Sequence, residues 1–264
     1  MSAWWLLVGF AVFLIGVTKS GFGAGVGLTI VPMTVVALGH LPPGAGAALG
    51  LMLPLLIVGD IIAVAQYRKL FNKQVIYRLL PGTVIGLLLG GSLLFIFHSQ
   101  TPKRLTAFIE IEVGLESIIL VGLHWWRTWR AEHEKIFRPS VIRSSAVGAF
   151  AGTSSTLAHA AGPIIALHLL PQKLERQMFV GTCAVYFFMV NTAKVPVYVS
   201  SHQFRADMIR PSLYALPLVF CGAIFGYWLA KQLNEKLFAR IIYTLTFFLG
   251  WYLLYDGMGI LRSA

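Results

Sequence analysis

Apolar runs of about 20 residues recur along the whole chain, and short polar connections separate them. A helix of that length crosses a hydrocarbon core about 30 Å thick. The composition agrees, because 57% of the 264 residues are hydrophobic, 12% are charged and the mean hydropathy is +0.76. We therefore expect an all-α, polytopic membrane protein with no room for a soluble domain.

Two features of the composition could suggest other classes of protein, and their placement argues against both. A net charge of +11 is typical of a protein that binds nucleic acid. Here, however, the basic residues lie in short loops beside apolar segments, where membrane topology explains them. Cys183 and Cys221 lie within apolar segments, so we expect small buried hydrophobic residues rather than a disulfide or a metal site.

The amino terminus lacks the features of a cleaved signal peptide, so we expect its first segment in the mature protein.

The apolar segments form two groups, separated by the polar stretch RTWRAEHEKIFRPS. The segments are 3–18, 22–39, 44–66, 75–97 and 104–126, followed by 141–158, 162–171, 175–199, 211–231 and 236–257. Because 162–171 is too short to span alone, we expect it to form a re-entrant hairpin with the preceding segment. The sequence then predicts a first repeat at 1–126, a cytoplasmic linker at 127–140 and a second repeat at 141–264, each repeat with a broken or re-entrant hairpin and three transmembrane helices.

An odd number of spans inverts the second repeat, and the basic residues test this topology. Of the 21 Lys and Arg residues, 14 lie in loops on one side of the predicted membrane, 5 lie on the other side, and Lys19 and Lys194 lie within it. The richer side should be cytoplasmic. Two full crossings by 1–39 would give the same parity, so the charges leave open whether this segment is re-entrant.

The two halves also resemble each other in sequence, at YRLLPGTVIG and LYALPLVFCG and again at GDIIAVAQY and VNTAKVPVY. The matched pairs are Pro81 with Pro217, Gly86 with Gly222, Asp60 with Asn191, and Tyr67 with Tyr198. These matches favour an inverted repeat, whose substrate site should lie near the membrane midplane where the two halves meet.

The stretch GVTKSGFGAGVG places a lysine and several glycines inside an apolar segment. Glycine suits an interrupted helix, and a helix that restarts near Gly23 would direct its unpaired N–H groups at the break, where they can bind an anion. Lys19 adds a positive charge. Two alternatives remain open: Gly21 and Gly25 have the spacing of a helix-packing motif, and Lys19 could snorkel if 1–39 crossed the membrane twice.

The stretch GTSSTLAHAAGP offers a matching break in the second half. Its hydroxyl groups and His159 would supply hydrogen bonds, and Gly162 and Pro163 would begin the next short helix. The predicted substrate-binding residues from both breaks and the following span are Lys19, Ser20, Gly21, Gly23, Gly25, Thr153, Ser154, Ser155, His159, Gly162 and Asn191.

Four further ionisable residues within the membrane are candidates for coupling transport to another ion. Asp60 could carry a proton, pair with a lysine or cap a backbone group, and Lys194 could either act in transport or snorkel. Glu112 and Glu116 share a helix face, and their repulsion would favour a proton on one of them. Because acids repel an anion, we expect these two in a separate path or in a subunit contact of a homodimer.

Several classes of site have no signature in this sequence. We find no His, Cys and Asp spacing of a metal site, no Ser-His-Asp arrangement, no phosphate loop and no dinucleotide-binding fingerprint. We therefore expect no cofactor and no enzymatic activity, and the partners that remain are the lipid bilayer and a small anionic substrate.

The stretches GFGAGVGLTIVP, GDIIAVAQYRKLFNKQVIYRLLPGTVIG, HAAGPIIALHLL and NTAKVPVY resemble the sulfite exporter TauE/SafE family, in family order and over nearly the whole chain. The resemblance implies a bacterial inner-membrane protein with duplicated halves that moves sulfite, sulfonates such as sulfoacetate, or related small anions, commonly outward. One departure is HAAGP, where the family often has a glycine triplet.

The sequence therefore predicts a secondary transporter for a small sulfur-containing or organic anion, which works by alternating access between two inverted halves. A passive anion channel would share the basic vestibule. A proton-coupled cation or metal carrier would instead use Asp60, Glu112, Glu116 and the histidines.

Overall fold

The computed structural model describes residues 3–22, 29–39, 47–67, 69–98, 102–130, 139–204, 206–232 and 235–263, and these residues form helices and turns without a strand. In chain order the elements are α1 (Ala3–Val17), a π-helical turn η1 (Thr18–Phe22), α2 (Ile30–Gly39), α3 (Ala47–Gln66), α4 (Lys73–His98), α5 (Pro102–Arg130), α6 (Val141–Ala158), α7 (Ala161–Leu169), a 3₁₀ turn η4 (Leu170–Gln172), α8 (Arg176–Ser200), α9 (Ala206–Gln232) and α10 (Glu235–Arg262). The predicted all-α class is confirmed.

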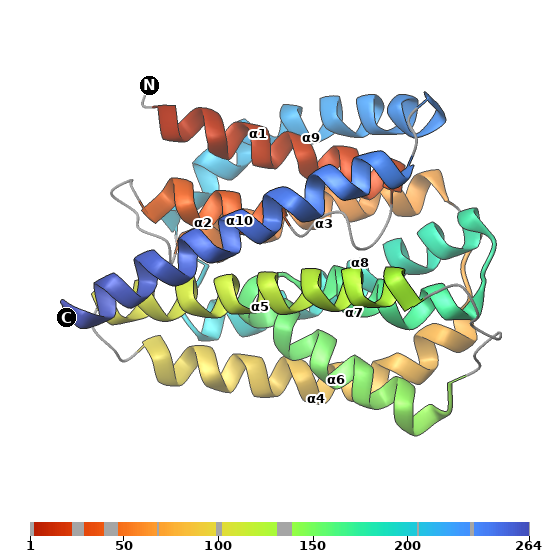
Figure 1. Ribbon diagram of the computed structural model, residues 1–264, viewed down its shortest axis with the longest axis horizontal. Helices are drawn as coiled ribbons and strands as arrows, with labels where there is room; N and C mark the ends of the chain where they lie inside the picture. Colours follow the sequence, from red (N-terminus) through yellow and green to blue (C-terminus); the bar gives the residue numbers. More distant parts are fainter. Residues whose placement is uncertain are drawn as a thin grey trace.

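Helices from the two halves of the sequence pack in pairs. In Figure 1, α1 and α9 form one edge of the molecule and α4 and α6 the opposite edge. The α5 and α10 helices pack against each other in front, while α3 packs against α8 in the interior. Each of these four pairs joins a helix from before residue 131 with one from after residue 140.

Two of the pairs owe their close approach to glycine. A Cβ atom on Gly86 of α4 would clash with the Ala149 carbonyl oxygen of α6, and one on Gly222 of α9 would clash with the Phe13 carbonyl oxygen of α1. Helix backbones approach this closely only where a side chain is missing, as is common between membrane helices. The two glycines that match between the sequence halves therefore have the same packing role.

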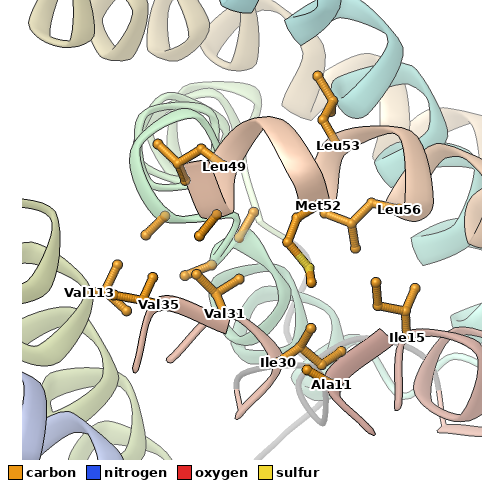
Figure 2. Close-up of a cluster of buried hydrophobic side chains, with 14 of the residues drawn as sticks. Ala11, Ile15, Ile30, Val31, Val35, Leu49, Met52, Leu53, Leu56 and Val113 are labelled. Carbon is orange, nitrogen blue, oxygen red and sulfur yellow. The ribbon is translucent and has the colours of Figure 1, made fainter. Parts of the chain in front are cut away.

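The apolar core extends through the molecule, and one part of it lies between α1, α2 and α3. Figure 2 shows Ile15 of α1, Ile30 and Val31 of α2, and Met52 and Leu56 of α3 directed toward one another. Nearly all of α2 is buried, from Ile30 through Leu38. An apolar helix buried on all sides needs neighbours around its whole circumference, which fixes α2 in the centre of the molecule.

Within the described residues, five helices are long and apolar enough to cross a membrane, whereas α2 and α7 are much shorter. At 1.5 Å per residue, the 10 residues of α2 and the 9 of α7 reach about 15 Å and 14 Å, half of a hydrocarbon core. Within the predicted segment 22–39, α2 begins at Ile30, and the helix restart expected near Gly23 falls on residues outside the described part of the chain. The α5 helix continues to Arg130, into the segment predicted as a linker.

The packing of α4 on α6 can be tested with two matched substitutions. We expect Gly86→Ala to lower the free energy of unfolding by about 1 to 3 kcal/mol, because the new methyl group overlaps the α6 backbone. Gly122→Ala on α5 makes the same change where nothing lies within 4 Å, and it should leave stability unchanged or raise it. Thermal unfolding in detergent measures both, and equal losses for the two variants would contradict the packing argument.

Candidate functional site

A cavity lies where η1, α2, α3, the junction between α6 and α7, and α8 meet. The polar side chains that line it come from both halves of the sequence: Thr18, Lys19, Ser155, His159 and Asn191. Apolar residues such as Ile30, Val31 and Leu56 line the rest.

Lys19 enters the cavity from η1, the π-helical turn that ends α1. Its side chain is 15% exposed, and its Nζ atom lies 2.5 Å from Asp60 Oδ1 and 4.8 Å from the centroid of the Phe187 ring. A single π turn widens the helix and often occurs at functional sites. The amine is thus bonded inside the protein and does not have the geometry of a snorkelling lysine.

Asp60 on α3 is fully buried and joins the two halves of the chain. Its Oδ1 atom accepts from Lys19, and its Oδ2 atom accepts from Asn191 Nδ2 at 2.6 Å. Ionised carboxylates are stable in a protein interior only when paired and hydrogen-bonded in this way. Of the three roles that the sequence left open for Asp60, the structure shows pairing with a lysine.

Lys194 on α8 is also completely buried, so the snorkelling alternative is wrong. Its Nζ atom lies 2.9 Å from the Ser155 carbonyl oxygen, 3.1 Å from Ser155 Oγ and 2.7 Å from His159 Nδ1. These three acceptors match the three N–H donors of an ammonium group. No carboxylate is among them, so hydrogen bonds to neutral acceptors hold this amine.

His159 ends α6 in a left-handed conformation, with φ 52°. Glycine is the usual residue at such a position, so a histidine there places a functional side chain where the backbone disfavours one. The Nε2 atom lies 3.0 Å from the Leu49 carbonyl oxygen, which can only accept. Nε2 therefore carries the ring proton, and Nδ1 is free to accept from Lys194.

Two tyrosines satisfy backbone carbonyls at the two breaks. Tyr67 donates to the Ser20 carbonyl oxygen at 3.1 Å, and Tyr198 donates to the Thr156 carbonyl oxygen at 2.7 Å. Carbonyls at a helix end lack their intrahelical partner, and in a membrane they need another donor. These are the two tyrosines that match between the sequence halves.

The amino-terminal end of α7 faces the cavity through Ala160, Ala161, Gly162 and Pro163. No side chain caps this helix, so its first N–H groups and the positive end of its dipole are directed at the cavity. Ile30 and Val31 at the start of α2 line the same cavity. Both short helices therefore begin at the site, in a geometry that suits an anion.

Two of the predicted binding hydroxyls point elsewhere. Thr153 donates to the Gly86 carbonyl oxygen of α4, and Ser154 donates to the Glu116 carboxylate of α5. Neither residue lines the cavity. Both lie in the last turns of α6, which remains helical to Ala158, so the break itself is limited to His159 and Ala160. The Thr153 hydroxyl also lies 3.0 Å from the Ala149 carbonyl oxygen of its own helix.

The first break is described in part. Ser20 and Gly21 are buried in η1 and do not line the cavity, and Ser20 Oγ has no hydrogen-bond partner among the described residues. Gly23 and Gly25, which we predicted as binding residues, lie outside the described residues. Lys19, Ser155, His159, Gly162 and Asn191 are the predicted residues that the structure gathers around the cavity.

One face of α8 contributes residues that the sequence analysis missed. Val180, Cys183, Ala184 and Phe187 line the cavity together with Asn191. They follow the spacing of three and four residues that places side chains on one helix face. Their position could have been derived by extending this spacing back from Asn191, but no single one of them is polar enough to stand out in an apolar segment.

The charges around the cavity favour an anionic ligand. Lys19 and Lys194 supply two amines against the single carboxylate of Asp60, and the α7 amino terminus adds donors. Among the described residues no group of three or more His, Cys, Asp or Glu side chains could hold a metal ion.

The sequence matches the family model described as sulfite exporter TauE/SafE over residues 8–253. This confirms the family expected from the sequence motifs. We find no match among curated proteins or among solved structures.

A native cysteine allows access to the cavity to be measured. We expect Cys183, which lines the cavity, to react with a methanethiosulfonate reagent that carries a sulfonate head faster than with one that carries a trimethylammonium head, because the amines attract the anion. Mass spectrometry of the purified protein gives both rates. A faster reaction of the cationic reagent would contradict the positive charge of the site.

Cys221 provides the control. We expected it to be buried, but it is exposed on α9, outside the cavity lining. In a Cys221→Ser background, Cys183 is the cysteine that reacts, and the measured rates are its own. In a Cys183→Ser background, the preference for the sulfonate reagent should disappear.

Proposed function

The chain belongs to the sulfite exporter TauE/SafE family, which comprises membrane transporters of sulfite or related anions, and on this premise we propose that it is a secondary transporter of a small sulfur-containing or organic anion. Sulfite and sulfonates such as sulfoacetate are the leading substrates. The observation that carries the proposal is the cavity with Lys19 on its wall and the amino terminus of α7 at its edge.

The substrate binds between the two breaks. An oxyanion there receives hydrogen bonds from Lys19, from Ser155 and from the first N–H groups of α7. Asn191 assists by holding Asp60, the counterion of Lys19. Lys194 does not line the cavity, but its Nζ atom bonds to Ser155 and His159 directly behind the cavity wall and holds both residues in place.

The two halves form an inverted repeat. The tyrosine bonds at the two breaks support this arrangement. Tyr67 and Tyr198 each lie at the end of the third apolar segment of their half, and each donates to a carbonyl at the break of the same half. The reciprocal pairs α1 with α9 and α4 with α6 support it as well. In this arrangement α1 with α2, and α6 with α7, are re-entrant hairpins whose short helices meet at mid-membrane.

Transport proceeds by alternating access to this single site. The sequence contains no nucleotide-binding motif, so an ion gradient or the membrane potential provides the energy. An anion that moves outward gains about 2.3 kcal/mol per charge for each 100 mV of negative interior potential. We place the protein in the inner membrane of a bacterium, with the loops rich in Lys and Arg on the cytoplasmic side.

Anion binding is tested by thermal shift on the purified protein. We expect sulfite or sulfoacetate to stabilise the wild type, by about 2.7 kcal/mol at a ligand concentration 100 times Kd, and taurine, sulfate and simple carboxylates to rank below the true substrate. The double variant Lys19→Gln/Asp60→Asn should lose this stabilisation, because it removes the ammonium group without leaving a buried charge unpaired.

The control is Arg210→Gln, which removes one positive charge from an exposed position of α9. It should keep the full ligand response. A double variant that responds like the wild type would remove Lys19 from the site. Saturable counterflow in proteoliposomes then distinguishes a carrier from an anion channel, and stabilisation by cations in place of anions would favour a cation carrier.

A further inference from the structure

We propose that Asp60 is a proton-binding site of this transporter, and that its protonation releases Lys19 to the anionic substrate, so that one proton moves with each anion. This inference rests on the proposed function and names the coupling ion of the same site. The proton comes from the aqueous side to which the cavity opens, attaches to a carboxylate oxygen of Asp60, and leaves with the anion on the other side.

The geometry of the ion pair requires a competition. Lys19 reaches the cavity wall, but its Nζ atom is held by Asp60 Oδ1 at 2.5 Å. An anion that binds Lys19 comes close to this carboxylate and is repelled by it. Because the carboxylate is fully buried, water does not screen this repulsion effectively. Anion and ionised Asp60 are therefore alternative counterions for one ammonium group.

The surroundings of Asp60 also accommodate its neutral form. Asn191 Nδ2 bonds to Oδ2 and remains a suitable donor when the carboxyl is protonated. The proton then resides on Oδ1, the oxygen that Lys19 leaves. A protonated Oδ1 is itself a donor, and it can bond to an oxygen of the bound anion. Protonation thus converts a repulsive group into a binding group.

The other ionisable groups near Asp60 are cations or lie elsewhere. Lys19 faces it from η1 and Lys194 from α8, while His159 lies beyond Lys194 and donates its Nε2 proton to the Leu49 carbonyl oxygen. The α1 and α2 helices contain no ionisable side chain. The ionisable side chains of α9 that the structure describes are at exposed positions: Arg210, Tyr214, Cys221 and Tyr227.

Glu116 of α5, a half-buried carboxyl close to a break, belongs to a different environment. It accepts a hydrogen bond from Ser154 of α6 and does not line the cavity. Asp60 is therefore the carboxyl in direct contact with a lining cation, within the part of the chain that the structure describes.

The charge of the ion pair indicates what the anion meets at this site. With Asp60 ionised, the charges of Lys19 and Asp60 cancel, and with Asp60 protonated the charge of Lys19 is left to the anion. The dianion sulfoacetate is a suitable probe. A dianion that moves with one proton carries one net negative charge, so a negative interior drives it outward.

The first experiment counts protons. Sulfoacetate is titrated calorimetrically into the purified full-length protein at pH 7.5 in two buffers of different ionisation enthalpy. We expect uptake of about one proton per bound anion, because the linked group is ionised in the empty site and neutral in the loaded one. Anion binding without proton uptake overturns the proposal and leaves the proposed function intact.

The second experiment measures coupling in proteoliposomes with the membrane potential clamped at zero. Counterflow of labelled sulfoacetate at equal pH tests the proposed function, and its absence overturns that function together with the proton site. Given counterflow, we expect an exterior one pH unit more acidic to accumulate the anion up to about tenfold, as linkage to one proton requires. Counterflow without this accumulation overturns the proton site alone.

Matched variants assign the proton to a residue. In Asp60→Asn we expect exchange that no longer depends on pH and no accumulation driven by the gradient. Glu116→Gln makes the same chemical change at a half-buried carboxyl outside the cavity and should keep both proton uptake and accumulation. The reverse pattern overturns the assignment. If Asp60→Asn fails to fold, the Glu116→Gln result still decides, because loss of proton uptake in that variant contradicts a site at Asp60.

Discussion

A fully buried aspartate needs a positive partner inside an apolar protein, and the bond that Asp60 makes to Lys19 organises this part of the structure. Lys19 and Asp60 are 41 residues apart, and Asn191 joins them from the other half of the chain. Their bonds determine how η1, α3 and α8 meet. The cavity lies beside these bonds, and polar side chains from both halves of the chain line its wall.

The sequence predicted the features that depend on composition and local chemistry. Apolar periodicity gave the helices, and the shortness of 162–171 indicated that α7 could not span the membrane alone. Charged and polar side chains are costly inside a membrane, and this rule led to Lys19, Asp60 and Asn191. The structure brings these three residues into one hydrogen-bonded group. The match between Tyr67 and Tyr198 was a weak similarity in sequence, yet each residue donates to a carbonyl at its own break.

Features that depend on long-range packing could not be predicted in the same way. A hydroxyl in a helix can serve the cavity or a neighbouring helix, and only the position of α4 and α5 shows that Thr153 and Ser154 serve neighbours. Lys194 looked close enough to a boundary to reach water, but its depth depends on how α8 packs against the end of α6. Phe187 and Cys183 are apolar among apolar residues, and their role depends on which face of α8 borders the cavity.

The glycine contacts limit how such a molecule can move. Backbones that touch at Gly86 and at Gly222 have no layer of side chains between them along which to slide, so α4 stays with α6 and α9 stays with α1. Each of these rigid bodies contains one helix from either half of the sequence. A transport cycle therefore moves each of these helix pairs as a unit, and hinges are to be sought in the connections that leave the two pairs.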